Sequence, residues 1–565
     1  MTLRRSTRLT ATLGALATAL CLVSAGNGQS PTPDVVVVNG RVFTADRSRP
    51  YAEALAIRGD RIVAVGTSAD VESLGGAGTT HVDAGGRLVI PGINDSHYHL
   101  RIEPRAFALP FTSRDPGWDE VKVAVTAATT QAPKGTLIRG ETGAALLDDT
   151  RVTRAALDAI APEHPVILST WTGHSEFLNT AAFRLLGVKD DEPDPVGGRY
   201  VRASDGTLGG LVLGFARFRL ARRLSELAPD DKALDDTRRF LDQAVRYGIT
   251  SVQLMSIPPS APRALALFEK AATPIRVRMI RFLLTDHRGR LATEGRHLRP
   301  SPGSLVMVSG TKWVIDGTPV ERSAAMREPY LDRPGTSGSA YLPDAEIPTI
   351  LRESLQNDDQ LLVHVVGDRT IQTVLNAMDA TGGRAVWATR RVRFEHADSL
   401  MPDLIPRAKA LGVIVVQNPT HLGLNLKQWG PERAPQNQPM RALLDAGIPL
   451  AIGSDGPNNP YLNIMLAATY RGKPADALTR EQAVTAYTLT AAYAEFAEKD
   501  KGSLEPGKLA DLAVLSQDIF RVPTQELPKT VSVLTMVGGR VVYDAKVRSL
   551  QPFDRRDGPM TAAGP

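Results

Sequence analysis

Apolar and polar residues alternate in a distinctive way near both ends of the chain. Asp34–Phe43 contains an Asn-Gly pair between two apolar segments, and Ala54–Ile57 and Ile62–Gly66 flank a second turn. Similar short segments recur near the other end: Ala510–Leu515, Val531–Val537 and Arg540–Tyr543. This spacing is typical of strands joined by tight turns. We therefore expect residues 31–87 and 501–545 to pair into one small β-sandwich.

Between the ends, short β-branched runs alternate with helical patterns, which predicts βα units and a parallel sheet. Eight runs follow this pattern: Leu88–Ile93, Ile249–Leu254, Arg276–Leu284, Thr311–Ile315, Leu361–Val365, Val392–Glu395, Val413–Gln417 and Leu450–Gly453. Eight parallel strands with intervening helices predict an α/β fold, a (β/α)8 TIM barrel, over residues 88–500. The stretch of about residues 100–245 is too long for a loop and contains its own strand and helix patterns, such as Ala216–Ala228. We expect it to form a subdomain inserted after the first barrel strand, over the barrel mouth.

Residues 1–25 have the pattern of a signal peptide. Arg4, Arg5 and Arg8 precede the apolar run Leu9–Val23, and Val23-Ser24-Ala25 is a small-residue cleavage site. The run is short for a membrane span, so we expect a periplasmic or secreted protein without a membrane anchor after processing. A membrane-anchored form is the alternative, and the Arg4-Arg5 pair leaves the Sec and twin-arginine export routes both open.

Composition narrows the function further. The 565-residue chain has a formal net charge of +5, and three of these charges belong to the predicted signal peptide, which leaves +2. Because no basic segment is interleaved with aromatic residues, we do not expect nucleic-acid binding, and a small molecule is the expected substrate. The single cysteine, Cys21, lies in the leader, which excludes disulfides, zinc–thiolate sites and cysteine nucleophiles from the mature chain. Residues 546–565 form a Pro/Gly-rich tail.

Polar residues stand at the ends of the predicted barrel strands, where barrel enzymes carry their reactive groups. His97 and His99 follow the first run, and positions i and i+2 of a strand share a face, so both rings can point to one place. Other runs end at or near Lys312, His364, His396 and Asp455. A single histidine in an apolar strand is usually a core residue. Four histidines and an aspartate at the mouth of one barrel instead predict a metal centre.

The same residues belong to motifs that resemble a known family. These motifs are Asn39–Val42, Pro91–His99, Gly248–Val252, Lys312–Gly317, His364–Asp368, Glu395-His396, Ser454–Pro457 and Gly502–Leu512. In them the chain resembles the amidohydrolase superfamily, and within it the YtcJ-like amidohydrolase 3 branch, which includes N-substituted formamide deformylase-like enzymes. The resemblance extends over nearly the whole mature chain.

The resemblance implies a centre for one or two divalent ions, with zinc as the default. The implied ligands are His97, His99 and Asp455 for one ion, His364 and His396 for the other, and Lys312, carrying CO2 as a carbamate, between them. An ordinary lysine in a salt bridge is the alternative for Lys312. A homodimer is compatible with the resemblance, although no sequence feature demands one.

The resemblance also implies a reaction, the hydrolysis of a non-peptide amide by metal-activated hydroxide. Asp455 would take a proton from the water and later pass one to the leaving amine. Four residues are expected to contact the substrate: His174, Trp171, His421 and Tyr98. Trp171 and Thr172 stand where the branch usually has more polar residues, which favours an apolar or aromatic substrate.

Two other functions remain open from the sequence. The same metal centre could serve a lactonase or carboxylesterase, because the same nucleophile attacks esters and amides. A secreted binding protein that kept the barrel and lost catalysis is the second alternative. The complete set of expected ligands argues against it.

Overall fold

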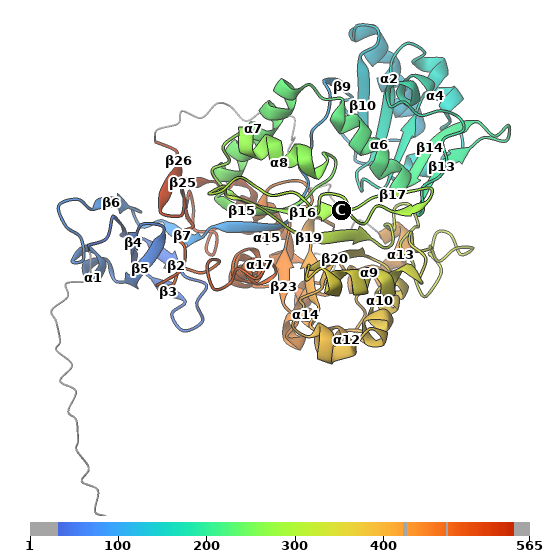
Figure 1. Cartoon of the computed structure of the whole chain (residues 1–565). Coiled ribbons are helices and arrows are strands. Elements are labelled where there is room, and N and C mark those ends of the chain that lie inside the picture. Colours follow the sequence, from blue (N-terminus) through green and yellow to red (C-terminus); the bar gives the residue numbers. More distant parts are fainter. Residues whose placement is uncertain (1–31, 422–425, 471–472, 547–565) are drawn as a thin grey trace, which may run out of the picture.

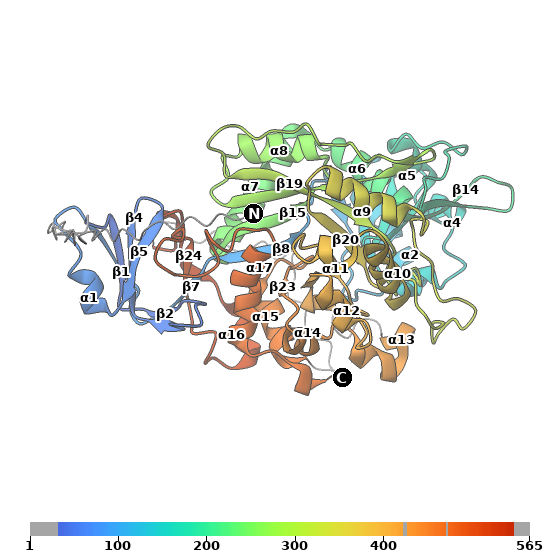
Figure 2. The same ribbon diagram turned by 60° about the horizontal axis from the view of Figure 1, so that its bottom comes forward.

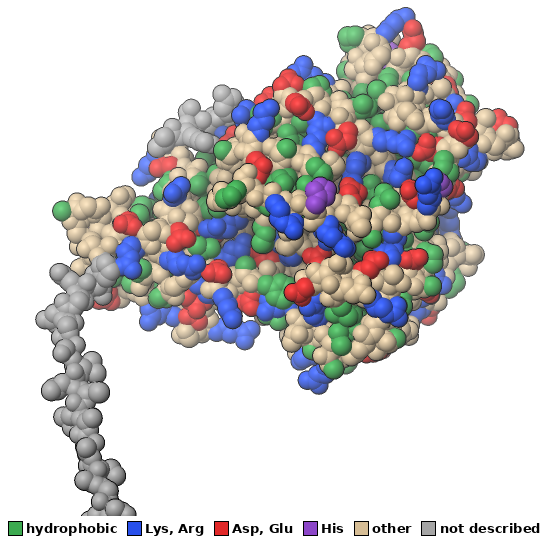
Figure 3. Space-filling model, viewed as in Figure 1, with side chains coloured by type: hydrophobic (Ala, Val, Ile, Leu, Met, Phe, Trp, Pro, Cys, Tyr) green, Lys and Arg blue, Asp and Glu red, His purple; other side chains and the backbone are tan. Residues whose placement is uncertain are grey.

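The computed structural model describes residues 32–421, 426–470 and 473–546. The predicted signal peptide and all but the first residue of the predicted tail lie outside this part. The terminal sheets, the barrel and the insert follow one another across the molecule (Figures 1 and 2). On the face shown in Figure 3, acidic and basic side chains are intermixed. Within the described ranges, no helix is both long and apolar enough to cross a membrane.

Eight parallel strands form the predicted barrel, and they follow one another in sequence order around the sheet. They are β8 (Ile93–Tyr98), β15 (Ile249–Met255), β16 (Arg276–Phe282), β19 (Val306–Val314), β20 (Leu361–Val365), β21 (Arg393–His396), β22 (Ile414–Gln417) and β23 (Leu450–Ile452). The barrel is closed where β23 meets β8: the Asp455 amide donates to the His97 carbonyl (2.9 Å), and the Ser454 amide donates to Asp95 Oδ1 (2.9 Å). Gly453 permits this close approach, because a Cβ at that position would overlap His97.

The first barrel strand begins later than the sequence pattern predicts. The run Leu88–Ile93 is split between two sheets: β7 (Leu88–Pro91) pairs with strands of the terminal domain, whereas β8 pairs with β15 of the barrel. Gly92 separates the two strands, and a side chain there would overlap Thr250. The run is continuously apolar because both strands are buried on both faces, so the pattern alone does not mark the boundary.

Helices cover the outside of the barrel (Figure 1). They include α7 (Asp230–Arg246), α8 (Ala261–Lys270), α9 (Glu346–Gln356), α10 (Asp368–Ala380), α12 (Ile405–Ala410), α14 (Met440–Ala446), α15 (Pro460–Thr469) and α16 (Arg480–Tyr487). Although the sequence pattern places α7 in the insert, the helix packs against β15 and contributes Phe240 and Leu241 to the barrel core. The short hairpin of β17 (Thr285–Asp286) and β18 (Gly289–Arg290) lies between β16 and β19.

The insert is built on its own six-stranded sheet, ordered β13-β14-β12-β11-β10-β9. Its strands are β9 (Ala106–Ala108), β10 (Leu137–Thr142), β11 (Val166–Thr170), β12 (Ser175–Leu178), β13 (Gly198–Arg202) and β14 (Leu208–Gly214). The helices α2 (Trp118–Gln131), α4 (Arg154–Ile160), α5 (Thr180–Leu185) and α6 (Phe215–Glu226) accompany it. The turn between β11 and β12, residues 171–174, brings the insert to the barrel mouth, because the His174 and His364 rings lie 4.9 Å apart.

Segments from both ends of the chain pair in the terminal domain, as predicted. One sheet has the order β5-β4-β1-β6 and the other β26-β25-β24-β7-β2-β3. The strands are β1 (Val35–Val38), β2 (Arg41–Phe43), β3 (Tyr51–Ala52), β4 (Ala54–Arg58), β5 (Arg61–Gly66), β6 (Thr80–Asp83), β24 (Leu512–Leu515), β25 (Ser532–Val537) and β26 (Arg540–Asp544). Residues of both ends share one core, including Val42, Leu55 and Leu512. The Asn39-Gly40 turn does not close a hairpin, because β1 and β2 enter different sheets.

Candidate metal centre

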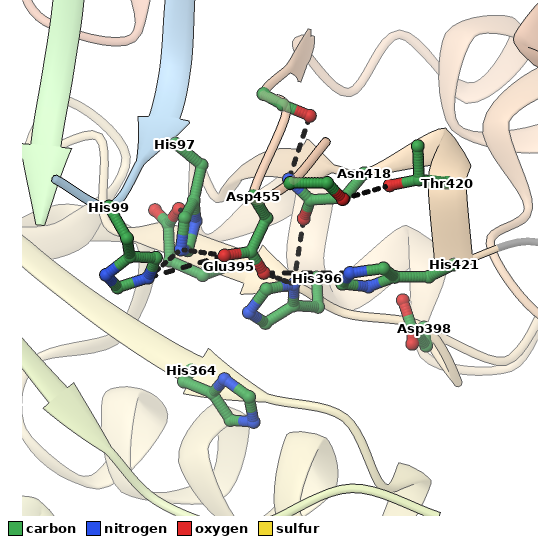
Figure 4. A network of polar contacts seen from close by, with 12 residues as sticks. His97, His99, His364, Glu395, His396, Asp398, Asn418, Thr420, His421 and Asp455 are labelled. Carbon is green, nitrogen blue, oxygen red and sulfur yellow. Dashed lines mark hydrogen bonds and ion pairs between the residues drawn. The ribbon is translucent and has the colours of Figure 1, made fainter. Parts of the chain in front are cut away.

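His97, His99 and Asp455 form a triangle of ligand atoms at the mouth of the barrel (Figure 4). The Nε2 atoms of His97 and His99 are 3.3 Å apart, and Asp455 Oδ1 lies 3.8 Å from the first and 3.4 Å from the second. In a tetrahedral zinc site with bonds of roughly 2.0–2.1 Å, ligand atoms lie about 3.3 Å from one another. The two nitrogens and one oxygen therefore have the chemistry and the spacing to hold a divalent ion.

The opposite ring nitrogens of these histidines are already bound to acceptors. The His97 Nδ1 lies 2.6 Å from Glu395 Oε2, and the His99 Nδ1 lies 3.1 Å from the Ile257 carbonyl. Since a carboxylate and a carbonyl are acceptors, each Nδ1 carries the proton and donates. Each Nε2 is then left with a lone pair directed at the centre, as metal ligation requires.

His396 and His364 extend the cluster on the side away from His99. The His396 ring lies 4.9 Å from the His97 ring and 4.5 Å from the His364 ring. His396 Nδ1 donates to Asn418 Oδ1 (2.8 Å), and ligand atoms of His97, His396 and Asp455 all lie within 4.8 Å of one another. His364 lies beside His396 and apart from Asp455 (Figure 4). The structure thus brings together all four predicted histidines, with His364 at the edge of the group.

Asp455 connects the two sides of this cluster. Its Oδ1 faces His97 and His99, whereas Oδ2 lies 3.7 Å from His421 Nε2 and 3.9 Å from His396 Nδ1. The backbones of Asp455 (φ 49°) and His396 (φ 68°) are left-handed, a conformation that residues other than glycine adopt at an energetic cost. Two of the predicted ligands are therefore held in strained backbone conformations at the ends of their strands.

Burial favours the neutral, metal-binding form of the imidazoles. It lowers the pKa of His99 to about 3 and the pKa values of His97, His364 and His396 well below their usual range, and the Lys312 ammonium adds to each effect. Burial has the opposite effect on Asp455 and raises the pKa of its carboxyl to about 7, although Lys312 opposes the shift. Near neutral pH the histidines are ready to ligate an ion, whereas the Asp455 carboxyl is partly protonated and must lose its proton to do so.

Lys312 points into the barrel. Its Nζ lies 3.0 Å from His97 Nε2, and the residue is 1% exposed. Burial lowers the pKa of the amine to about 8, while Glu395 and Asp455 oppose the shift. A buried lysine with a lowered pKa has a larger neutral fraction near pH 7–8, and the neutral amine is the form that reacts with CO2.

Three of the four predicted substrate contacts lie above the cluster. The His421 ring stacks on His396 at 5.5 Å, and the Trp171 ring lies 6.4 Å from His421. On the other side, His174 lies beside His364, and its Nδ1 is 3.1 Å from the Tyr341 hydroxyl. Trp171 and His174 come from the insert, so the insert forms one wall of the site.

Tyr98 does not belong to this wall, contrary to the prediction. Its ring stacks on Phe240 of α7 at 4.5 Å, and its hydroxyl accepts a hydrogen bond from Asn458 (2.9 Å). The reason is the alternation of side chains along β8: His97 and His99 point into the barrel, and the residue between them points outward.

Glu395 and Arg393 support the site, and the sequence analysis did not assign them a role. Arg393 donates from Nε to Glu395 Oε1 (2.8 Å), and both residues are fully buried. Glu395 in turn orients His97. A signal was available, since two charged residues two positions apart in an apolar strand must be paired when buried. Their partner lies on β8, about three hundred residues earlier, so the pairing could not be read from local sequence.

A family model described as the amidohydrolase family matches residues 80–543. The chain is 28% identical to the protein LONG AFTER FAR-RED 3 of Arabidopsis thaliana, over 90% of this chain and 91% of that protein. It is 27% identical to the N-substituted formamide deformylase of Arthrobacter pascens (90% and 98%) and 25% identical to the putative amidohydrolase YtcJ of Bacillus subtilis (89% and 98%).

Solved structures have the same fold. A metal-dependent hydrolase from Pyrococcus horikoshii superposes with a TM-score of 0.67 at 22% identity, covering 87% of this chain and 99% of the other. An adenosine deaminase from Xanthomonas campestris with bound zinc gives a TM-score of 0.53 at 14% identity, covering 91% and 93%. The family match, the relatives and the histidine–aspartate cluster together identify a hydrolytic enzyme. The chain belongs to the amidohydrolase family.

Proposed function

We propose that this enzyme hydrolyses a carbon–nitrogen bond in a small, non-peptide amide, using one or two divalent ions, with zinc the first choice. The observation that carries the proposal is the triangle of His97, His99 and Asp455, whose ligand atoms lie 3.3–3.8 Å apart. The relative named for deformylation of N-substituted formamides supports an amide as the bond that is cleaved.

We assign one ion to His97, His99 and Asp455, and a second to His364 and His396. Carboxylated Lys312 would supply the oxygen ligands between them, because an ammonium cannot bind a cation whereas a carbamate is an anion with two oxygens. When bound, such ions lower the pKa of water and polarise the scissile carbonyl.

Asp455 is the general base and then the general acid in this proposal. It takes a proton from the attacking water and gives one to the leaving nitrogen, which lets the amine depart without a covalent enzyme intermediate. The position of Asp455 suits both steps, because its Oδ1 faces His97 and His99 and its Oδ2 faces His421.

His421 and His174 lie on either side of the site and can orient the substrate. Burial lowers the pKa of His421 to about 4 and that of His174 to about 3, so both are neutral near pH 7 and can donate one ring N–H to a carbonyl oxygen. Trp171 provides an apolar surface next to His421 for the organic part of the substrate.

The test is hydrolysis by zinc-loaded mature protein of a panel of N-formyl amines, N-acyl amino acids, cyclic amides, lactones and aryl esters, with products followed by mass spectrometry. Turnover of amides that disappears in Asp455→Asn supports the proposal. Fast cleavage of esters or lactones with inert amides would replace it with the lactonase or carboxylesterase function.

We also propose that the enzyme acts in the periplasm or outside the cell, after removal of residues 1–25. The proposal depends on the arginine-led apolar segment at the start of the chain. N-terminal sequencing of protein recovered from the periplasm or medium would show a new terminus near residue 26. Full-length protein confined to the cytoplasm would contradict the export proposal.

A further inference from the structure

The turn between β11 and β12, residues 171–174, has an arginine at each end. At one end the Trp171 ring lies 6.4 Å from the His421 ring, which in turn lies 5.5 Å from the His396 ring. At the other end His174 lies 4.9 Å from His364. Both ends of the turn therefore lie close to the metal cluster, and a charged group next to either end lies near the proposed site.

Arg217 of α6 lies against the His174 end of this turn. A Cβ at Gly173 would be 3.6 Å from the Nη1 atom of Arg217, and the Arg217 Nε is 3.3 Å from Glu176 Oε1. The side chain is only 15% exposed, yet neither terminal nitrogen makes a hydrogen bond with another residue in the described part of the chain. The other arginines of this helix have definite partners: Arg219 binds the Thr285 carbonyl, Arg222 binds Glu294 and Arg223 binds Glu192.

Arg114 lies at the Trp171 end. Its guanidinium carbon is 5.8 Å from the centre of the Trp171 ring, and its side chain forms no hydrogen bond with any described residue. Both arginines act electrostatically on the site. Burial is the larger cause of the lowered pKa of His174 and of His421, and the charge of Arg217 adds to the first shift and that of Arg114 to the second. The mouth of the site therefore holds two guanidinium groups whose terminal nitrogens form no hydrogen bond with another described residue.

We propose that this arginine pair recognises a carboxylate of the substrate, with Arg217 as the principal contact and Arg114 at the rim. This inference rests on the proposed amide hydrolysis and narrows its substrate to N-acylated amino acids. A guanidinium binds a carboxylate through two parallel N–H donors, and Arg217 has its two terminal nitrogens available for that purpose. The Trp171 ring beside the pair accommodates an apolar or aromatic side chain on the same molecule.

The experiment compares N-formylphenylalanine, as both enantiomers, with N-formylphenethylamine, which lacks only the carboxylate. Zinc-loaded wild type is expected to have a kcat/KM at least about tenfold higher for one enantiomer of the acid, because hydrogen bonds between a guanidinium and a carboxylate are charge-assisted and stronger than neutral ones. Arg217→Gln should reduce this ratio to near one, chiefly through KM, since the contact lies away from the reacting atoms. Arg217→Lys should keep part of the ratio, and Arg114→Gln should cause a smaller loss.

Arg223→Gln is the matched control, because Arg223 lies on the same helix and pairs with Glu192 away from the turn. Its preference for the acid should equal that of the wild type. A wild-type ratio near one, or a ratio that survives in Arg217→Gln, overturns the proposal; the second result would assign the carboxylate to another cation of the site, either Arg114 or the metal.

Calorimetric titration of the same compounds into zinc-loaded protein separates this inference from the proposed reaction. If neither amide is hydrolysed, amide hydrolysis fails for this class, but carboxylate recognition still predicts tighter binding of the acid that depends on Arg217. Equal binding of N-formylphenylalanine and N-formylphenethylamine, or no detectable binding of N-formylphenylalanine, overturns the proposed carboxylate recognition. Unfolding temperature and zinc content of each variant confirm that the fold and the metal centre remain intact.

Discussion

His97 Nδ1 lies 2.6 Å from Glu395 Oε2, and both side chains are fully buried. The contact joins the first and sixth strands of the barrel across its interior and fixes the orientation of one proposed ligand. Arg393, two residues earlier on β21 and on the same face of the strand, donates a hydrogen bond to the same carboxylate. The position of His97 is therefore set by a hydrogen bond to a carboxylate of β21, which Arg393 holds in place, as well as by its own strand.

Glu395→Gln should weaken zinc binding about 10–100-fold, the usual effect of losing a carboxylate that orients a ligating histidine. The amide can still accept from Nδ1, but it no longer increases the basicity of His97 or neutralises Arg393. Competition with a chromophoric chelator measures the zinc Kd. Glu498→Gln is the control, because Glu498 also pairs with an arginine at 2.7 Å, and this arginine, Arg391, lies before the start of β21, whereas the ligand His396 is at the end of that strand. Equal zinc affinity in Glu395→Gln and wild type would show that the contact has no role at the metal.

Asp455→Asn should retain bound metal at saturating zinc and lose a factor of about 10²–10⁴ in kcat, the usual contribution of a positioned general acid–base group. The amide oxygen of asparagine can still ligate the metal as a neutral group, but it cannot take a proton from water. Metal analysis and steady-state kinetics on the same preparation separate the two effects. Near-normal turnover with metal bound would rule out Asp455 as the base.

Zinc affinity should fall as the pH is lowered below 7. The raised pKa of Asp455, about 7, means that its carboxyl is protonated below that pH and must release a proton to bind the ion. The histidines add little to this dependence above pH 5, since burial keeps the pKa of His99 at about 3. Titrations between pH 5.5 and 8 should give a loss of up to about tenfold per pH unit below 7 and, above it, a shallower rise that follows the carboxylation of Lys312. A slope of two or more protons below pH 7 would show that the histidines or Lys312 also release protons there, and the same slope in Asp455→Asn would remove Asp455 as its source.

Lys312 should carry a carbamate in protein exposed to bicarbonate. Its lowered pKa, about 8, makes the amine half neutral near pH 8, so the carbamate fraction should rise between pH 7 and 8.5. Carbon-13 NMR of zinc-loaded protein in labelled bicarbonate detects the modification, and Lys312→Arg supplies the blank. An identical spectrum for the two proteins at pH 8 would leave Lys312 as an unmodified amine.

Gly453→Ala should destabilise the barrel by roughly 1–3 kcal/mol, the usual cost of an extra methyl group in a packed interior. The added Cβ would overlap His97 at the junction of β23 and β8 and displace the ligands on both strands. Chemical denaturation gives the change in the free energy of unfolding, and zinc affinity should fall with it. Gly335→Ala is a suitable comparison, because no atom lies within 4 Å of the position its Cβ would take. Equal stability of the two variants would contradict the tight closure at Gly453.

The strands that build the site were predictable because each is a short apolar run that ends in a polar residue. Seven of the eight predicted runs overlap barrel strands, although β19 begins five residues before its predicted run, and the remaining one failed where two buried strands follow each other without a polar break at Gly92. The Asn39-Gly40 turn shows a related limit, since local turn chemistry does not determine which sheet each flanking strand enters.

The ligand histidines were predictable from their place at strand ends, whereas their supports were not. Glu395, Asn418 and the Ile257 carbonyl each hold a ring nitrogen of a histidine from a distant part of the sequence. Arg217 is one of several arginines on α6, and only the tertiary contacts of the described residues distinguish it, because the other three bind partners there and its terminal nitrogens do not. These contacts depend on tertiary structure, which the periodicity of the sequence does not encode.

The most direct test of the central claim is to measure hydrolysis of an N-formyl amine while the metal-free protein is titrated with zinc. The proposed function predicts no turnover without metal, a rise that follows the zinc bound by the protein, and no comparable rise in Asp455→Asn. Turnover that is independent of bound zinc, or fully loaded protein that cleaves esters and leaves amides intact, would contradict it.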